Sequence, residues 1–182
     1  MVNSKSAYSV AGKKQRNDTH IIVVWVDNEA GVLARVVGLF SGRGYNIESL
    51  AVAEVDQKQN ISRITIVTTG TPQVIDQIKL QLKKLVPVHK VADFKREDKN
   101  VIFKEMALFK FVANNKKLIS ALNACRNYNP VVLDQTKKSQ VIQITALRRE
   151  IDVITKNLKK FGLVSVSRTG AVAMTRGAEI FK

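Results

Sequence analysis

Short runs of apolar residues alternate along the chain with stretches in which every third or fourth residue is apolar. Residues 20–26, HIIVVWV, are nearly all apolar and rich in β-branched side chains, which predicts a central strand covered on both faces. Residues 30–42 place apolar side chains at helical spacing, and Gly42 and Gly44 are expected to close this helix in a left-handed cap. Residues 46–56 and 61–69 alternate as a hairpin, a second helix follows Pro72, and residues 88–94 form a fourth strand.

The same order of elements recurs in the second half of the chain. A strand at 105–112 is followed by a helix at 114–128, strands at 130–136 and 139–147, a helix at 149–161 and a strand at 163–169. Each half has the order βαββαβ, so the predicted fold class is α+β, with two tandem ferredoxin-like modules. Each module would leave one sheet face and two edge strands open, and we therefore expect at least a homodimer.

The domain boundaries follow changes in composition. Residues 1–19 contain Ser, Lys, Gly and Asn without apolar periodicity and are interpreted as a flexible leader. The first module covers residues 20–95, and the charged stretch KREDKN, Lys95 to Asn100, marks a linker that we place at 96–102. The second module covers residues 103–182.

Composition narrows the class of protein. The chain has 182 residues, of which 45% are apolar, as in a soluble globular protein. No apolar run approaches the roughly 20 residues of a membrane span, and no signal-peptide region is evident, so we expect a cytoplasmic protein without a membrane partner. The single cysteine, Cys125, cannot form an internal disulfide and falls on the apolar side of a predicted helix, where a buried structural thiol is expected.

The net charge of +15 raises the question of a nucleic-acid partner. Residues 96–182 carry 17 basic and 7 acidic residues, whereas residues 20–95 carry 9 and 7. The basic residues of the second half come as scattered pairs with few aromatic residues between them, which is not the pattern of an RNA-stacking surface. Solvated faces explain most of this charge, and nucleic acid remains the rival interpretation that we favour less.

The sequence contains no recognisable catalytic or metal-binding motif. The two histidines, His20 and His89, fall in predicted strands and are interpreted as ordinary strand residues. Neither metal-ligand spacing nor a nucleophile elbow nor a phosphate loop occurs, and SGRGYN lies at the end of a helix, where carbonyl groups are presented. We therefore predict no catalytic residue and no metal site on this chain.

The segment DNEAG, which leads from the first strand into the first helix, is the best candidate for a binding site. Free N–H groups around Ala30, Gly31 and Val32 would project from the positive end of the helix and could bind a carboxylate. Asn28 offers a donor and an acceptor in one side chain, which suits the head group of an amino acid. The alternative is that Asn28 merely caps the helix and Gly31 relieves a tight turn.

A resemblance to a known family sharpens this picture. The stretch VDNEAGVLARVVGLFSGRGYNIESLAVAEVD, followed by SRITIVT and QLKKLVPVHKV, resembles the N-terminal ACT domain of the small, regulatory subunit of acetolactate synthase (acetohydroxyacid synthase). SRTGAVAMTRG, residues 167–177, is similar to the C-terminal domain of the same family. The resemblance implies a non-catalytic subunit that activates a catalytic large subunit and mediates feedback inhibition by valine. Its partner would carry thiamine diphosphate, Mg and FAD, and this chain no cofactor.

The resemblance also implies where the effector would bind. In the family it lies between two ACT domains of a dimer, against the turn before the first helix of one and the start of the second strand of the other. By position, these residues are Asn28, Ala30, Gly31, Val32 and Leu33 in the turn, and Asn46 and Ile47 on the facing side. Val32, Leu33 and Ile47 would form the pocket for a small branched side chain, so valine, leucine and isoleucine are expected to overlap as ligands. Many relatives have a hydroxyl residue where this chain has Ala34, and position 30 is variable too. These differences concern how strongly the effector acts more than whether a site is present.

Overall fold

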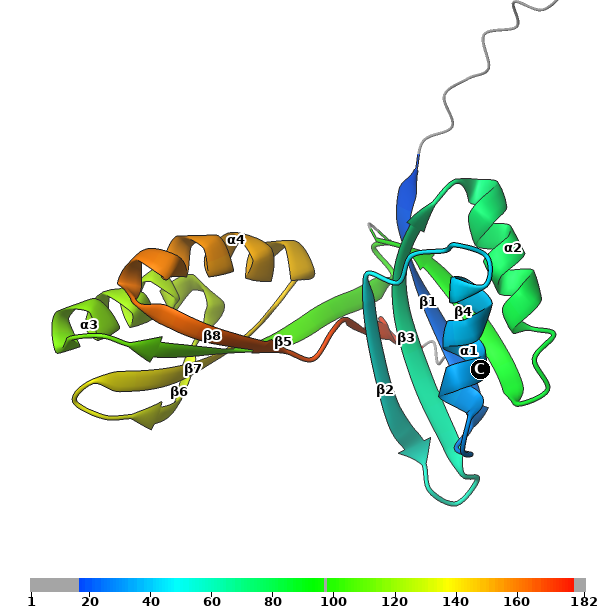
Figure 1. Ribbon diagram of the computed structural model, residues 1–182, viewed down its shortest axis with the longest axis horizontal. Coiled ribbons are helices and arrows are strands. Elements are labelled where there is room, and N and C mark those ends of the chain that lie inside the picture. The colour runs from blue at the N-terminus through cyan, green and yellow to red at the C-terminus, as the bar shows by residue number, and fades with distance from the viewer. Residues whose placement is uncertain (1–16, 97, 179–182) are drawn as a thin grey trace, which may run out of the picture.

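Two modules, each an antiparallel sheet with two helices on one face, make up the described part of the chain (Figure 1). The computed structural model describes residues 17–96 and 98–178. The predicted leader lies almost entirely outside this range, and only its last residues are described, since β1 begins at Asp18. The predicted α+β fold of two ferredoxin-like modules is confirmed.

The first module has the order predicted from the sequence. It comprises β1 (Asp18–Asp27), α1 (Val32–Ser41), β2 (Ser49–Asp56), β3 (Ile61–Gly70), α2 (Pro72–Leu82) and β4 (Val88–Lys95). The sheet order is β2-β3-β1-β4, so β1 is a central strand and β2 and β4 are the edges. The strand pairs are antiparallel, and β1 aligns Asp27 with Ile61 of β3.

The second module repeats this arrangement. It comprises β5 (Val101–Val112), α3 (Asn115–Ala124), β6 (Val131–Gln135), β7 (Ser139–Ala146), α4 (Arg148–Leu158), β8 (Leu163–Arg168) and β9 (Val172–Thr175), with short 3-10 helices at Arg126–Tyr128 and Lys159–Phe161. The sheet order is β6-β7-β5-β8, and β9 pairs with the first residues of β5. β5 begins at Val101, inside the segment 96–102 that the sequence suggested as a linker.

The apolar run of β1 is covered on both faces, as predicted. Ile22, Val24 and Val26 belong to the core beneath α1 and α2. Ile21 and Val23 point to the other face, where they pack with buried residues of β5 and β9 and the turn before β9, including Val101, Ala171 and Ala173. The ribbon formed by the start of β5 and by β9 therefore covers the sheet of the first module on the face away from its helices, and a second copy is not needed to cover that part.

The long strand β5 joins the two modules (Figure 1). Its first four residues pair with β9, and from Glu105 onward it pairs with β7. At this changeover Arg168 donates from Nε and Nη2 to the two carboxylate oxygens of Glu105, each at 2.7 Å, and from Nη1 to Asp152 at 2.6 Å. A bidentate pair of this kind fixes both distance and angle, so it ties the end of β8 and α4 to the middle of β5.

Polar side chains also join the modules directly. Arg148 at the start of α4 donates to the carbonyl of Glu48 at 3.3 Å, and the Ala171 amide donates to the Ser49 hydroxyl at 3.3 Å. Arg63 of β3 donates to the carbonyl of Ala173 and lies 5.3 Å from the ring of Trp25. Each of the three hydrogen bonds joins a residue of the first module to the second, so the connection is more than a single strand.

Candidate effector site

The turn between β1 and α1 is held by the hairpin that joins β2 to β3. The backbone N–H of Asn28 donates to the carbonyl of Asn60 at 2.7 Å, and Asn60 returns a side-chain hydrogen bond to the carbonyl of Asn28 at 3.3 Å. Asn60 adopts a φ of 55°, a conformation that asparagine tolerates better than most residues. The register that pairs Asp27 with Ile61 is what brings this hairpin under the turn.

The side chain of Asn28 does not cap α1. Its Oδ1 accepts a hydrogen bond at 3.0 Å from the hydroxyl of Ser62, a residue that is 5% exposed. The alternative interpretation of Asn28 as a helix cap is therefore wrong, because the residue at the cap position of α1 is Gly31 and no described side chain makes a capping hydrogen bond there. This bond leaves the amide Nδ2 group for another partner, and among the described residues nothing accepts from it.

Gly31 gives the turn its shape. α1 begins at Val32, slightly later than predicted, and Gly31 precedes it with φ 84° and ψ −8°. This left-handed conformation disfavours any residue with a Cβ, although a Cβ at this position would meet no atom within 4 Å. The tight turn expected at Gly31 is therefore present, and the space in front of it is open to a ligand.

The first turn of α1 has backbone donors that nothing in the described chain uses. The Val32 amide donates to the carbonyl of Glu29 at 3.3 Å, and the Arg35 amide donates to Gly31. No described residue accepts a hydrogen bond from the amides of Leu33 or Ala34. Such unpaired N–H groups at the positive end of a helix are suited to an anion such as the carboxylate of an amino acid.

The side chains of the predicted turn residues divide between surface and core. Asn28, Ala30 and Leu33 are exposed, Leu33 by 41%. Val32 is 3% exposed and packs in the core beneath the helices, so a contact with an effector would have to come from its backbone. Leu33 is thus the large apolar side chain that this turn exposes.

The other predicted half of the site lies beyond the far end of α1. Gly42 ends the helix in right-handed conformation, and the left-handed residue of this exit is Gly44, with φ 68°. Asn46 is exposed, and its carbonyl accepts a hydrogen bond from the Thr68 hydroxyl at 2.7 Å. Ile47 is partly buried against the core, and β2 begins only at Ser49.

The two halves are separated within one chain by the length of α1. Ten helical residues rise about 15 Å, so the turn at Gly31 and the loop at Asn46 lie at opposite ends of the helix. A single copy of the chain does not bring them together.

Two residues that are distant in the sequence hold this turn in place, and no short sequence motif indicates them. Ser62 and Asn60 lie more than thirty positions after Asn28 and meet it through the β1–β3 register. A hairpin with asparagine at its tip and a serine one step into the returning strand is common, so only the pairing of strands reveals its role.

The histidines and the cysteine have structural partners. His20 is buried and its Nδ1 lies 2.7 Å from Asp93, while Nε2 of His89 lies 2.5 Å from Asp27. Cys125 is buried in the second core, as predicted, and burial raises the pKa of its thiol to about 11. Within residues 17–96 and 98–178 no cluster of His, Cys, Asp or Glu has the makings of a metal site, and none of the helices is long and apolar enough to cross a membrane.

Comparison with known proteins agrees with this architecture. Residues 22–90 match the family described as the AHAS small subunit-like ACT domain, and residues 104–177 match the family described as the small subunit of acetolactate synthase.

Individual relatives match nearly the whole chain. The acetolactate synthase small subunit of Aquifex aeolicus is 38% identical over 162 residues, which cover 88% of this chain and 83% of that protein. The acetolactate synthase small subunit of Mycobacterium bovis is 35% identical over 159 residues, 87% of this chain and 93% of the relative. The crystal structure of the acetolactate synthase small subunit from Thermotoga maritima superposes with a TM-score of 0.78 at 31% identity and covers 88% of this chain and 99% of that one. The chain belongs to the acetolactate synthase small-subunit family, and its first module is an ACT domain of that family.

Proposed function

We propose that this chain is the non-catalytic regulatory subunit of an acetolactate synthase in branched-chain amino-acid biosynthesis. It raises the activity of a catalytic large subunit in the cytoplasm and makes that activity sensitive to valine. Thiamine diphosphate, Mg and FAD belong to the partner in this proposal, and this chain supplies regulation alone. Family membership supports the role, and the turn at Asn28 to Gly31 supports the effector.

The observation that carries the proposal is the open donor set at the start of α1. A free amino acid presents a carboxylate and an ammonium group close together. The unpaired amides of Leu33 and Ala34 and the Nδ2 group of Asn28 are donors for the carboxylate. The exposed side chain of Leu33 lies beside them and suits a short branched side chain.

The effector is proposed to bind between two copies of the chain. Because the turn and the Asn46 loop lie at opposite ends of α1, a two-fold axis that sets two α1 helices antiparallel would place the turn of each copy near the loop of the other. Such a homodimer, formed through its ACT domains, would have two equivalent sites. Each pocket would have two walls. One copy would supply Asn46 and Ile47, and its partner would supply Asn28, Ala30, Gly31, Val32 and Leu33.

Regulation then follows from unequal binding to two dimer arrangements. Valine that bridges two ACT domains stabilises the arrangement in which it fits, and this arrangement no longer activates the catalytic subunit. With a few hydrogen bonds, each worth about 1 kcal/mol net, and one small apolar side chain, affinity in the micromolar to millimolar range is expected.

The test adds the purified chain to its catalytic subunit and titrates valine. The wild-type chain should raise acetolactate formation, and valine should remove that increase. Gly31→Asp places a carboxylate where the ligand carboxylate binds and should abolish inhibition while activation remains.

Gly31→Asn is the matched control for this test. Asparagine has the shape of aspartate and tolerates the left-handed conformation, but it carries no charge. It should retain inhibition, with a modest rise in the valine concentration required. Equal loss in both variants would indicate a damaged turn rather than a blocked anion site, and unchanged inhibition in Gly31→Asp would refute the assigned site.

The same preparation distinguishes the rival functions. A stand-alone amino-acid sensor would bind valine without changing the catalytic subunit, and a nucleic-acid-binding protein would shift a labelled duplex in a salt-dependent manner. Either result without activation of the large subunit would contradict the proposal.

A further inference from the structure

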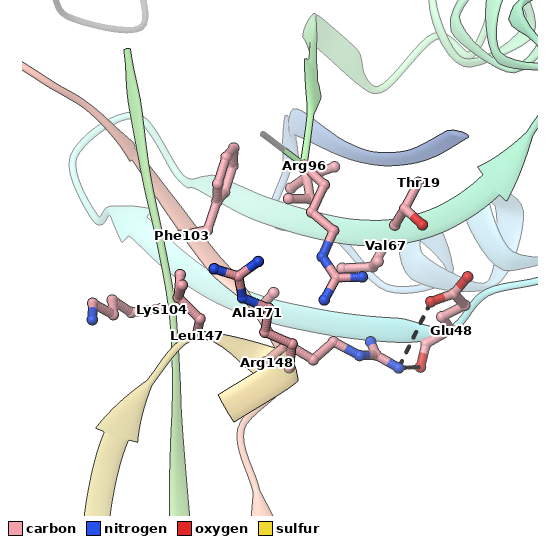
Figure 2. Close-up of a pocket in the computed structure, with 11 residues that line it drawn as sticks. Thr19, Glu48, Val67, Arg96, Phe103, Lys104, Leu147, Arg148 and Ala171 are labelled. Carbon is pink, nitrogen blue, oxygen red and sulfur yellow. Dashed lines mark hydrogen bonds and ion pairs between the residues drawn. The ribbon is translucent and has the colours of Figure 1, made fainter. Parts of the chain in front are cut away.

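A cavity of about 540 Å³ lies between the two modules, away from the predicted effector turn (Figure 2). Its floor is apolar and comes from both sides: Ile21 and Val67 from the ACT sheet, Phe103 from β5, and Ala171 from the turn before β9. The chain therefore forms a concave site whose walls belong to two modules.

Most of the charge on this cavity is positive. Four cations line it: Arg96 directly after β4, Lys104 of β5, and Arg148 and Arg149 in the first turn of α4. Among the described lining residues Glu48 supplies the one carboxylate. Arg148 lies 3.8 Å from that carboxylate and is the cation that contacts it. In the described part of the chain, neither Arg96 nor Arg149 has a carboxylate within ion-pair distance.

The cations that line the cavity come from both sides of the module boundary and do not all point the same way. Figure 2 shows the guanidinium of Arg96 directed toward Arg148, whereas the side chain of Lys104 extends the other way. Arg96 directly follows β4, and its backbone N–H donates to the carbonyl of Thr19 of the first module at 3.1 Å, whereas Arg149 belongs to α4 of the second module. Like charges gathered from two modules repel each other, and an anion between them removes this repulsion.

We propose that this cavity binds a small organic dianion, whose charged group lies between Arg96 and Arg149 and whose apolar part rests on Phe103. Guanidinium groups present planar pairs of donors that match the oxygens of a phosphate or a carboxylate. Two cations without a carboxylate partner among the described residues favour a doubly charged group over a single carboxylate, and the apolar lining favours an organic ligand over an inorganic ion. A concave site of about 540 Å³ also suits a small molecule better than an acidic segment of another protein.

The experiment measures binding to the full-length chain by titration calorimetry. Phenyl phosphate and phthalate are the two dianionic probes, and benzoate is the probe with one charge. At least one dianion should bind, and benzoate should bind at least about tenfold more weakly because it loses one charge-assisted contact. If phenyl phosphate binds more tightly, the natural ligand is a phosphate ester, and if phthalate binds more tightly, it is a dicarboxylate.

Substitutions locate the site. Arg96→Gln and Arg149→Gln should each weaken the better dianion about tenfold. Lys116→Gln on the exposed surface of α3 has the same loss of charge outside the cavity and should leave binding unchanged. Hydrogen exchange should slow on binding at both the end of β4 and the start of α4, because the ligand touches both modules. A melting curve for each variant shows that it is folded.

Three results would overturn the proposal. The first is that neither dianion binds at millimolar concentration. The second is that Lys116→Gln weakens binding as much as the cavity variants do, which would indicate a general charge effect. The third is a loss of affinity for the catalytic subunit in Arg149→Gln without any dianion binding, which would assign the cavity to a protein interface.

Discussion

Ser62 is the residue that fixes the orientation of Asn28, since its buried hydroxyl donates to Oδ1 of that side chain. Ser62→Ala removes this bond and lets the amide rotate, so its donors are no longer held toward the effector. One hydrogen bond contributes about 0.5–1.5 kcal/mol, and the valine concentration for half inhibition should rise roughly two- to tenfold. Inhibition curves with the catalytic subunit measure this. Ser165→Ala on the exposed surface of β8 is the control, and an equal shift there would remove the assigned role from Ser62.

Cys125 makes the free energy of unfolding of the chain depend on pH in the alkaline range. Burial raises the pKa of this thiol to about 11 in the folded chain, against about 8.5 in the unfolded chain. Between these values the unfolded state has lost its proton and the folded state has kept it, so stability falls as pH rises, by about 1.4 kcal/mol per pH unit. The contribution is complete below about pH 8.5 and is lost by about pH 11, a total of about 3 kcal/mol.

Comparison with Cys125→Ala isolates this contribution, because lysines and tyrosines titrate in the same range in both proteins. Urea unfolding at intervals from pH 7.5 to pH 11 should give a steeper loss for the wild-type chain than for the variant. Parallel curves would mean that the thiol titrates alike in both states.

At the scale of helices and strands, the sequence pattern correctly predicted the elements that bury their apolar face against other elements of the same module. The central strand β1 and the helices α1 to α4 have apolar residues at the spacing of a strand or a helix, and they form where expected. β9 and the first residues of β5 were missed. Val101 and Ala173 are buried only because the ACT sheet lies against them, and a pattern of four residues next to a charged stretch does not reveal such a distant partner.

The candidate site shows the same limit. The turn, the glycine and the open helix end follow from DNEAG alone. The support from Asn60 and Ser62 depends on strand register, and the burial of Val32 depends on how α1 is rotated against the sheet. Residue type indicates what a side chain can bind, whereas only packing decides whether it faces solvent.

The β9 strand should hold the two modules together. Ala173 is 4% exposed and faces the ACT sheet, whereas the neighbouring Val172 is 52% exposed. Ala173→Glu puts an unpaired charge into the apolar contact, which costs several kcal/mol, and should detach the ribbon and increase the radius of gyration in solution scattering. Val172→Glu introduces the same charge one position away on the open face and should leave the modules associated. If both variants scatter like the wild-type chain, β9 does not determine how the modules are joined.

At the scale of the whole molecule, the arrangement of half-sites in the proposed dimer makes a prediction that single variants cannot test. Gly31→Asp damages the turn of a copy and Asn46→Ala damages its loop, and these features lie at opposite ends of α1. In a homodimer of either variant both sites are damaged. In a mixed dimer the two lesions fall in one site, and the other site combines the intact loop of the first variant with the intact turn of the second.

Mixing the two variants should therefore restore valine binding that neither has alone. Random exchange of equal amounts makes about half of the dimers mixed, each with one intact site, so about a quarter of the wild-type number of valine sites should return. Titration calorimetry on the mixture measures that number after incubation long enough for subunits to exchange, which a mixture of wild-type chains with different tags can verify. The control is Gly31→Asp alone at the same total protein concentration. If exchange occurs and no binding returns, the effector is held within one copy of the chain, and the assignment of Asn46 and Ile47 to the facing wall is wrong.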